Sequence, residues 1–444
     1  MKKVITYGTF DLFHEGHYRL LQRAKALGDY LIVGVTTERY DKARGKLNVV
    51  DSLMTRIENV RKSGFADEII IEETIGQKIS DIKKYDIDIF TVGSDWVGKF
   101  DYIGEYCEVV YLERTKDISS TQLRHEAHRV QQIGIIGTGR LPARFVKESK
   151  FVSGASILGV YNPNKEHAAE FAKRNELKQY ETLEELYEAV DIVHIASPHS
   201  THYAYAKDAL EHGKHVICEK PMTLRKAETA ELYKLAREKN CVLVEDIKTA
   251  YCPGFDSLIN VARSGIIGQI KYVDACFTRL ADKNTRELTD VKTGGSFTEM
   301  ASTLLLPIMK LMGTEYEDVR FDCIHNEQGL DIFTKATISY ERGFASATCG
   351  LGVKAEGRLM IAGTEGYIVA EAPWWKTTYF EVRFEDASRV EKYTERFLGD
   401  GFRYTISDMV NRINGVTTST MQLTKEESEA ISNIIEQFLG QEER

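Results

Sequence analysis

Residues 3–25 read KVITYGTFDLFHEGHYRLLQRAK, and this stretch decides how the rest of the chain is interpreted. The apolar, β-branched run at its start is typical of a buried strand, and the apolar residues after Gly16 recur at helical spacing. A second apolar run, DYLIVGVTT, follows at residues 29–37. Strand, helix and strand in this order predict a βαβ unit with a parallel sheet.

Two histidines, His14 and His17, stand between the first strand and the helix. A zinc-protease site is disfavoured, because such sites space their histidines four apart on one helical face. A nucleophile paired with its base is disfavoured, because only Thr9 lies near. A cradle for phosphate is favoured, since Gly8 and Gly16 allow close backbone approach and a helix N-terminus attracts anions. A solvated turn before an ordinary helix is the alternative that this short stretch leaves open.

The composition limits what kind of protein this is. The 444 residues are 43% hydrophobic and carry a formal net charge of -9, which is enough length for two or three domains and offers no basic surface overall. We therefore expect no nucleic-acid partner and no membrane partner. Seven cysteines lie far apart without a CxxC pair, as in reduced thiols. Without a signal peptide or a long apolar run, the expected location is cytoplasmic.

The alternation of strand and helix occurs twice along the chain. It continues weakly to about residue 130, restarts at QQIGIIGTGR (residues 131–140), and then runs on through DIVHIASP, KHVICEKP and CVLVED. After about Cys252 several strands follow in succession, which predicts an added antiparallel sheet. The predicted fold class is α/β, with a Rossmann-like domain over residues 1–130, a second Rossmann domain over 131–251, and an α+β substrate and oligomerisation domain with C-terminal helices over 252–444. The boundary at 130 lacks a Pro, Gly or Ser-rich linker, so closely packed domains are expected.

Three segments of the first domain resemble one enzyme family. They are YGTFDLFHEGHYRLLQRAKALGDYLIVGV (7–35), VGSDWVGKFDY (92–102) and EVVYLERTKDISSTQLR (108–124). They are similar to the HxGH nucleotidyltransferases that join CTP to a polyol phosphate, above all the glycerol-3-phosphate cytidylyltransferases. The resemblance implies that His14, His17 and Arg114 are catalytic. It also implies a set of nucleotide-binding residues: Thr9, Phe10, Asp11, Lys46, Arg56, Asp95, Trp96, Thr115, Ser119, Ser120 and Thr121.

The identity of the acceptor remains open, because Asp117 stands where this family usually has glycine. The chemistry explains why no serine nucleophile is needed. A phosphate monoester has a second pKa of about 6, so it arrives at neutral pH largely as a dianion. The enzyme then needs to align the acceptor with the α-phosphate of CTP and to stabilise the spreading charge. Mg²⁺ is expected to enter with CTP, and no metal site formed by protein ligands is predicted.

A second glycine turn, IGIIGTGRLP at residues 133–142, follows a strand and opens a helix. Gly137 and Gly139 occupy the first two positions of a GxGxxG pattern, and Pro142 stands at the third. In its βαβ setting the pattern predicts dinucleotide binding, with a structural turn as the alternative.

The choice between NAD and NADP is usually made about 20 residues further on. There the chain has Tyr161 and Asn162, with Lys165 close by. Because no carboxylate would repel a 2′-phosphate, we expect NADPH to bind at least as well as NADH, with help from Lys165.

The segment DIVHIASPHSTHYAYAKDALEHGKHVICEKPMTL (191–224) resembles the Gfo/Idh/MocA oxidoreductases, whose Rossmann domain carries an EKP signature after a strand. SGIIGQIKYV (264–273), GTEGYIVAEAPWWKTTYFEV (363–382) and FRYTISDMVNRI (402–413) fit the same family. The resemblance implies that Lys220 lies between nicotinamide and substrate and donates to the reacting oxygen. The cofactor-binding residues that we assign are Gly137, Thr138, Gly139, Arg140, Tyr161, Asn162, Ser197, His199, His202 and Glu219. His199 and His202 either face the nicotinamide or only begin a helix.

The family's usual catalytic pair is altered in this chain. In TGGSFTEMAST (293–303), Glu299 takes the place of an aspartate and Thr303 that of a histidine or tyrosine. Threonine cannot act as an acid near neutral pH, so the usual proton donor is missing. Lys220, Glu299, Lys248 or a histidine from another segment is the possible substitute. The alternative is that this domain no longer carries out hydride transfer.

Two hypotheses follow. In the first, a bifunctional enzyme reduces a keto sugar phosphate with NAD(P)H and couples the polyol phosphate to CTP, releasing pyrophosphate and giving a CDP-polyol for a cell-surface polymer. In the second, the chain is a cytidylyltransferase with a non-catalytic oxidoreductase-like scaffold. NAD-dependent epimerisation of the polyol is a third, less favoured, option. A homo-oligomer, dimer or tetramer, is expected.

Overall fold

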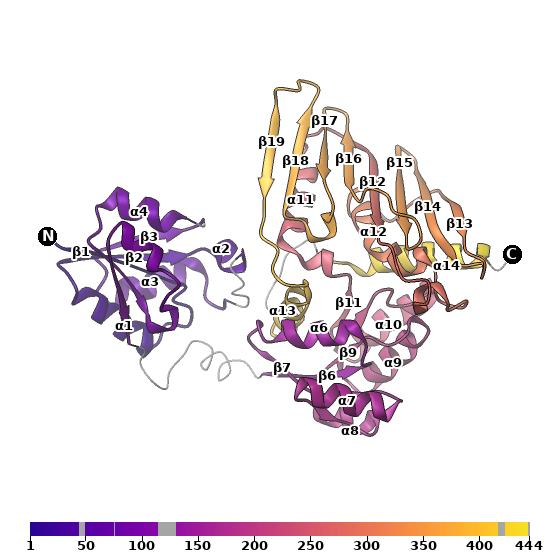
Figure 1. Cartoon of the computed structure of the whole chain (residues 1–444), viewed down its shortest axis with the longest axis horizontal. Helices are drawn as coiled ribbons and strands as arrows, with labels where there is room; N and C mark the ends of the chain where they lie inside the picture. Colours follow the sequence, from indigo (N-terminus) through magenta and orange to yellow (C-terminus); the bar gives the residue numbers. More distant parts are fainter. Residues whose placement is uncertain (44–48, 75, 114–129, 416–421, 443–444) are drawn as a thin grey trace. The chain divides into compact units, whose positions relative to one another are not determined.

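The computed structural model describes residues 1–43, 49–74, 76–113, 130–415 and 422–442. The chain divides into two compact units, one of residues 1–130 with 151–154, and one of residues 131–150 with 155–444 (Figure 1). The predicted division into three domains at residues 130 and 251 stays a prediction. Within the described residues, no helix combines the length and the apolar character that crossing a bilayer requires.

The first unit is built on a parallel sheet in the order β3-β2-β1-β4-β5. Its strands are β1 (Lys3–Gly8), β2 (Tyr30–Thr36), β3 (Glu68–Glu72), β4 (Ile89–Gly93) and β5 (Glu108–Leu112), and its helices are α1 (Glu15–Lys25), α2 (Glu38–Ala43), α3 (Leu53–Lys62) and α4 (Gln77–Tyr85). Buried apolar clusters cover both faces of the sheet, as parallel sheets require. The strand order reverses between β1 and β4, so ligands are expected beyond the carboxyl ends of these two strands.

The second unit begins with another parallel sheet, in the order β11-β10-β9-β6-β7-β8. Its strands are β6 (Gln131–Ile136), β7 (Ala155–Tyr161), β8 (Lys178–Gln179), β9 (Ile192–Ile195), β10 (His215–Glu219) and β11 (Leu243–Asp246). The connecting helices are α6 (Arg140–Ser149), α7 (Lys165–Asn175), α8 (Leu183–Ala189), α9 (His199–Glu211) and α10 (Lys226–Glu238). The direction of winding changes between β6 and β9, which places a second ligand crevice there. The predicted α/β fold of both regions is confirmed.

The second unit also contains an eight-stranded sheet in the order β13-β14-β15-β12-β16-β17-β18-β19. These strands are β12 (Ile270–Thr278), β13 (Asp318–His325), β14 (Asp331–Tyr340), β15 (Gly343–Gly350), β16 (Leu359–Gly363), β17 (Gly366–Ala370), β18 (Tyr379–Phe384) and β19 (Val390–Thr394). Neighbours are antiparallel except for β12 and β15, which are parallel. That pair is possible because a long connection separates the two strands in sequence. The predicted antiparallel sheet is therefore present, with one parallel pair inside it.

Four helices join this sheet to the parallel one: α11 (Pro253–Arg263), α12 (Ser296–Met312), α13 (Phe402–Ile413) and α14 (Lys425–Glu442). Helix α12 packs on β12, β14 and β15, and α14 contacts both α10 and α12. Helix α13 contacts α6. The first turn of α12 therefore meets the carboxyl edge of the parallel sheet, which is the edge where a cofactor is expected.

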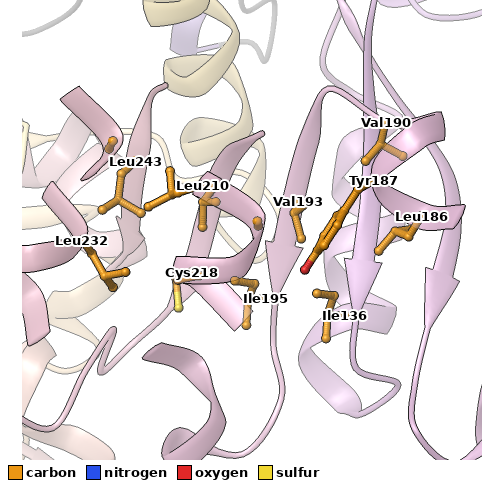
Figure 2. Close-up of a cluster of buried hydrophobic side chains, with 14 of the residues drawn as sticks. Ile136, Leu186, Tyr187, Val190, Val193, Ile195, Leu210, Cys218, Leu232 and Leu243 are labelled. Atoms are coloured by element: carbon orange, nitrogen blue, oxygen red, sulfur yellow. The ribbon is translucent and has the colours of Figure 1, made fainter. Parts of the chain in front are cut away.

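The core of the second parallel sheet is shown in Figure 2. Leu186 of α8, Val193 of β9 and Leu210 of α9 are each fully buried there. A side chain on Gly134 of β6 would place its Cβ 2.6 Å from Leu186 Cδ1, so only glycine lets α8 approach this closely. This packing sets the distance between the sheet and the helix.

Leu186→Ala should lower the free energy of unfolding by about 2–5 kcal/mol, because the tightly packed site cannot collapse around the missing methyl groups. The matched control is Leu280→Ala in the same unit, where the side chain is 61% exposed. The control should stay within about 0.5 kcal/mol of the wild type. Urea unfolding followed by far-UV circular dichroism measures both, and equal losses in the two variants would contradict the packing described.

Candidate active sites

The two predicted histidines meet in the loop between β1 and α1. Phe10 and Leu12 both have positive φ, 52° and 46°, so the loop turns sharply before the helix. His14 is the N-cap of α1, and its Nδ1 accepts a hydrogen bond from the Gly16 amide at 3.0 Å. The rings of His14 and His17 stack with their centroids 3.9 Å apart. Because Nδ1 of His14 is an acceptor, the proton of the neutral ring lies on Nε2, where it can be donated to a phosphoryl oxygen.

Asp11 holds this loop in place. It is fully buried, and its Oδ1 accepts from the amides of Val50 at 3.0 Å and Asp51 at 2.9 Å. Asp51 in turn accepts from the Leu12 amide at 2.9 Å. Thr9 donates to Asp41 at 3.0 Å. These bonds tie the HxGH loop to the segments before and after it, so Asp11 and Thr9 shape the site through the backbone.

Arg56 of α3 also supports the loop from beneath. Its guanidinium is fully buried and donates to the carbonyl oxygens of Thr9 at 3.0 Å, Thr36 at 2.7 Å and Asp51 at 3.0 Å, and to Glu38 Oε1 at 3.0 Å. Asp41 Oδ2 lies 3.6 Å from Arg56 Nη1. This arrangement makes Arg56 a positioning residue for the loop; the nucleotide contact predicted for it stays a prediction.

Asp95 and Trp96 follow β4, the strand that pairs with β1. They belong to the short 3-10 turn η1 (Ser94–Trp96), which directly follows β4. Trp96 is 42% exposed, and Lys99 Nζ lies 5.5 Å from the centre of its ring. The roles of the other predicted site residues stay predictions, because these residues lie outside the described ones. They are Lys46, Arg114, Thr115, Ser119, Ser120 and Thr121.

The second glycine turn opens a cavity of about 590 Å³ in the second unit. Gly137 has a φ of 112°, and a Cβ on it would lie 2.4 Å from the Ala196 carbonyl oxygen, so a side chain has no room there. Of the ten predicted cofactor-binding residues, nine line the cavity: Gly137, Thr138, Gly139, Arg140, Asn162, Ser197, His199, His202 and Glu219. Helix α6 begins at Arg140, which lines the cavity, and the free amides of a helix N-terminus favour the binding of an anion. A dinucleotide cofactor fits these residues.

Tyr161 and Lys165, which were expected to contact the cofactor, do not line the cavity. Tyr161 is not among the residues that line the cavity; its carbonyl oxygen accepts from the Gly137 amide at 3.0 Å. Asn162 donates to Thr138 Oγ1 at 2.8 Å. Lys165 pairs with Glu181 at 3.2 Å and does not line the cavity, so its contribution to 2′-phosphate binding would require it to leave that partner.

Lys220, Glu299 and His199 converge at the inner end of the cavity. Lys220 follows β10 and donates to the carbonyl oxygen of Glu299 and, at 3.1 Å, to its Oε1. His199 begins α9, and its Nε2 lies 3.4 Å from Glu299 Oε2. Burial raises the pKa of Glu299, but the charge of Lys220, the hydrogen bond that Lys220 donates and smaller contributions from nearby groups together outweigh burial and hold that pKa below its ordinary value. Glu299 is therefore a carboxylate that orients the ammonium of Lys220.

The two histidines of this region are neutral. Burial lowers the pKa of His199 to about 3 and also lowers the pKa of His202. His202 lies 2.9 Å from the Pro221 carbonyl oxygen and 2.8 Å from that of Ser197, so it links α9 to the segment after β10. Nδ1 of His199 is buried without a hydrogen bond. His199 is thus the histidine that faces the cavity with unused bonding capacity.

A second cavity of about 300 Å³ adjoins the first and shares Lys220, Glu299, Glu219, Arg140 and Leu141 with it. Thr303 lines it, as expected for the altered catalytic position. Several other residues that line this cavity were not predicted from the sequence: Arg144, Arg279, Phe277, Trp375, Lys376 and Phe397. The rings of Phe277 and Trp375 stack with centroids 3.8 Å apart. These residues come from separate elements, so no local pattern connects them.

The charge of the second cavity is predominantly positive. Its basic side chains are Arg140, Arg144, Lys220, Lys248, Arg279 and Lys376, and its acidic ones are Glu219, Asp246, Glu299 and Asp400. Burial, and after it the charge of Asp246, raises the pKa of Glu219 to about 8, which removes most of one negative charge at pH 7. An anionic ligand therefore suits this cavity.

Comparison with known proteins agrees with the two units. Residues 5–126 match a family described as cytidylyltransferase-like, and residues 131–246 match the oxidoreductase family with an NAD-binding Rossmann fold, Gfo/Idh/MocA. The glycerol-3-phosphate cytidylyltransferase of Bacillus spizizenii is 53% identical over 126 residues, which are 28% of this chain and 97% of that protein.

Two solved structures resemble the second unit. The UDP-N-acetylglucosamine 3-dehydrogenase GnnA from Acidithiobacillus ferrooxidans has a TM-score of 0.59 and 22% identity, over 70% of this chain and 99% of that one. KijD10, a 3-ketoreductase from Actinomadura kijaniata solved with NADP and TDP-benzene, has a TM-score of 0.59 and 18% identity, over 69% and 95% of the two chains. At this identity the likeness shows the fold.

Fold, crevices and comparisons together define a nucleotidyltransferase fused to an NAD(P)-binding oxidoreductase. In its N-terminal part the chain belongs to the glycerol-3-phosphate cytidylyltransferase family, and its residues 131–246 match the Gfo/Idh/MocA oxidoreductase family. The resemblance stated from the sequence is confirmed, and the two families support a bifunctional enzyme.

The buried guanidinium of Arg56 generates a stability prediction. Arg56→Met should lower the free energy of unfolding by about 3–5 kcal/mol, because three carbonyl oxygens lose the guanidinium N–H groups that they accept and buried Asp41 loses its cationic neighbour. Arg61→Met on the same helix is the matched control, since Arg61 pairs only with Glu58 at a site where its side chain is 63% exposed. The control should change stability by less than about 1 kcal/mol. Urea unfolding measures both variants. Similar losses of unfolding free energy in the two would contradict the positioning role of Arg56.

The neutral state of His199 predicts a pH dependence. An unfolded histidine titrates near 6.5, whereas the pKa of folded His199 is about 3. Between these two pKa values only the unfolded state binds the proton. The contribution of buried, neutral His199 to the free energy of unfolding is therefore complete above pH 6.5 and is lost as the pH falls. From pH 7 to pH 5, His199→Asn should lose about 2 kcal/mol less stability than the wild type. His167→Asn, at an exposed position, should show the same change of unfolding free energy with pH as the wild type. If the unfolding free energies of His199→Asn and the wild type changed equally with pH, the argument from the burial of His199 would be contradicted.

Proposed function

We propose that the second unit reduces a keto sugar phosphate with NAD(P)H and that the first unit transfers a cytidylyl group from CTP to the resulting polyol phosphate. The observation that carries the proposal is the positively charged second cavity, which shares Lys220 and Glu299 with the cofactor cavity. A phosphorylated substrate would place its anion among Arg140, Arg279 and Lys376 and its carbonyl group at Lys220. The stacked pair of Phe277 and Trp375 offers an apolar wall for a carbon skeleton.

In the transferase, the acceptor is a phosphate oxygen. It attacks the α-phosphorus of CTP, the bond to the β-phosphate breaks, and pyrophosphate leaves. The Nε2–H of His14 and the amides at the start of α1 stabilise the negative charge that spreads over the phosphoryl oxygens. His17 lies in the first turn of α1, and its ring stacks on that of His14. We expect Mg²⁺ to arrive bound to the triphosphate as part of the substrate, and the polyol to resemble glycerol 3-phosphate.

In the reductase, NAD(P)H supplies a hydride when bound. Lys220 donates a proton to the carbonyl oxygen and is later reprotonated from solvent. Glu299 is charged and keeps the ammonium in position, and neutral His199 lies behind it. Of the substitutes considered for the missing acid, Lys220 is the one whose proton lies where both cavities meet. The CDP-polyol would be an activated donor for a cell-surface polymer, and a homo-oligomer, dimer or tetramer, remains our expectation.

The scaffold hypothesis is favoured by Thr303, which lines the substrate cavity and cannot donate a proton at neutral pH. It predicts a protein that transfers the cytidylyl group but oxidises no reduced nicotinamide. The two hypotheses therefore differ in a single assay of the wild-type protein with CTP, NAD(P)H and ketose phosphates of three to five carbons.

Two variants should separate the activities. Lys220→Ala is expected to reduce NAD(P)H oxidation roughly 100-fold or more, because it removes the proton donor, and to leave cytidylyl transfer to a ready-made polyol phosphate nearly unchanged. His17→Ala should have the converse effect through lost stabilisation of the phosphoryl charge. Pyrophosphate release and absorbance of the reduced nicotinamide measure the two reactions, each with NADPH and NADH.

The outcomes distinguish the two halves of the proposal. Near-normal pyrophosphate release by His17→Ala would overturn the HxGH assignment. A wild-type protein that oxidises neither cofactor with any ketose phosphate would favour the scaffold. A clear preference for NADH would contradict the argument from Asn162 without affecting the transferase.

A further inference from the structure

Three side chains to which the proposed reaction gives no part in proton transfer meet at the second cavity, which two of them line. In the parallel sheet His194 of β9 pairs with Ile217 of β10, and Glu219 of β10 pairs with Asp246 of β11. Glu219 lies two residues beyond Ile217, so it projects from the same face of the sheet. The register therefore brings His194, Glu219 and Asp246 to one face at the carboxyl ends of three neighbouring strands.

All three side chains are buried and keep unused bonding capacity. His194 is 0% exposed, Asp246 1% and Glu219 3%. Both ring nitrogens of His194, Oε1 of Glu219 and Oδ2 of Asp246 are buried without a hydrogen-bond partner. Oδ1 of Asp246 accepts from Thr405 at 2.7 Å, which fixes that carboxylate. The ring of Phe145 stacks on His194 with centroids 3.7 Å apart and fixes the imidazole. Groups left unsatisfied in this way are costly unless another partner binds them.

The separations fit one shared ion better than direct bonds between the side chains. One ligand atom from each residue lies within 4.8 Å of the others. Nε2 of His194 is 4.0 Å from Oε1 of Glu219, which is too long for a hydrogen bond. Two ligands that each lie about 2.0–2.2 Å from one tetrahedral metal ion are about 3.4 Å apart. Binding one ion would therefore require the three side chains to move closer together, by roughly 0.5–1 Å, than they are without it.

The nearby cations Lys248 and Lys220 lower the pKa of Glu219, and Lys248 also lowers that of Asp246, but their ammonium groups have other neighbours. Lys220 is directed to Glu299, and the ammonium of Lys248 lies 4.1 Å from the centre of the Phe402 ring. Among the described residues, no lysine or arginine forms an ion pair with Glu219 or Asp246. A divalent cation would bind the carboxylate forms of Glu219 and Asp246, so its binding would displace the proton that burial favours on Glu219 at pH 7.

We propose that His194, Glu219 and Asp246 form a binding site for a divalent first-row transition-metal ion. One imidazole with two carboxylates suits Zn²⁺ or Mn²⁺, whereas Ca²⁺ and Mg²⁺ prefer oxygen ligands alone. Glu219 and Asp246 line the second cavity, so the remaining coordination positions are available to water or to an oxygen of a ligand there. The three residues lie 25 and 27 positions apart in the chain, a spacing that matches no metal-binding sequence pattern. The expectation of no protein metal site is revised by this proposal.

The test is titration of the full-length, chelator-treated protein with Zn²⁺, followed by calorimetry and by metal analysis after gel filtration. The wild type should retain one ion per chain that His194→Phe does not, with an affinity at least about 100-fold weaker in the variant. Phenylalanine keeps the ring that stacks on Phe145 and removes both nitrogens. Asp246→Asn, of nearly equal volume, is the second variant and should show the same loss. Circular dichroism confirms that each variant is folded.

Two controls separate this site from other histidines. His14→Ala removes one of the two stacked imidazoles of the first unit and should keep the ion assigned to the second unit. His212→Ala, at a partly exposed position on the same Rossmann domain, should bind as the wild type does. Co²⁺ should give the wild type visible absorption bands that disappear in His194→Phe. Zn²⁺ binding that is absent from the wild type, or equal in the wild type and both site variants, would overturn the proposal and leave a shared proton or water as the partner of the cluster. The result does not depend on either enzymatic activity.

Discussion

The contact between Lys220 and Glu299 is the interaction on which the second unit's chemistry depends. Lys220 stands at the end of a strand of the parallel sheet, and Glu299 in the first turn of the helix that packs on the eight-stranded sheet. Both side chains are largely buried, so each needs the other's charge to avoid the cost of desolvation. The same ion pair therefore joins the two sheets and forms the common wall of the two cavities.

A buried charge has a comparable place in the first unit. Arg56 donates to three carbonyl oxygens from three separate segments of the chain, and Asp41 and Glu38 balance its charge. Such an arrangement is stable only if every donor is used. The histidine loop thus rests on a rigid polar base, which is what a site needs when catalysis consists mainly of aligning charged groups. In both units the reactive groups lie at a sheet edge, and buried ion pairs determine their orientation.

The sequence allowed much of this to be predicted, because strands, helices and glycine turns are encoded locally. The two βαβ regions, the meeting of His14 with His17 and the need for glycine at 137 follow from short patterns. The contact of Lys220 with Glu299 was not predicted, because 79 residues separate them and the family resemblance only assigned each of them to the active site. The support role of Arg56 and the pairing of Lys165 with Glu181 could not be predicted, because a charged side chain's partner depends on tertiary packing. The basic side chains that line the second cavity, and the cluster of His194, Glu219 and Asp246, could not be predicted either, because their members come from separate elements.

The altered catalytic position decides how the second unit should be understood. Thr303 offers no proton, Glu299 is held as a carboxylate, and burial keeps His199 neutral. Of the groups at the junction of the cavities, Lys220 then combines a positive charge, a transferable proton and a fixed orientation. Arg144 and Lys376 share one acidic neighbour, Asp400, so the adjoining cavity keeps a surplus of basic groups and suits an anionic ligand. The choice between a reductase and a scaffold therefore depends on whether Lys220 transfers its proton to such a ligand beside the cofactor.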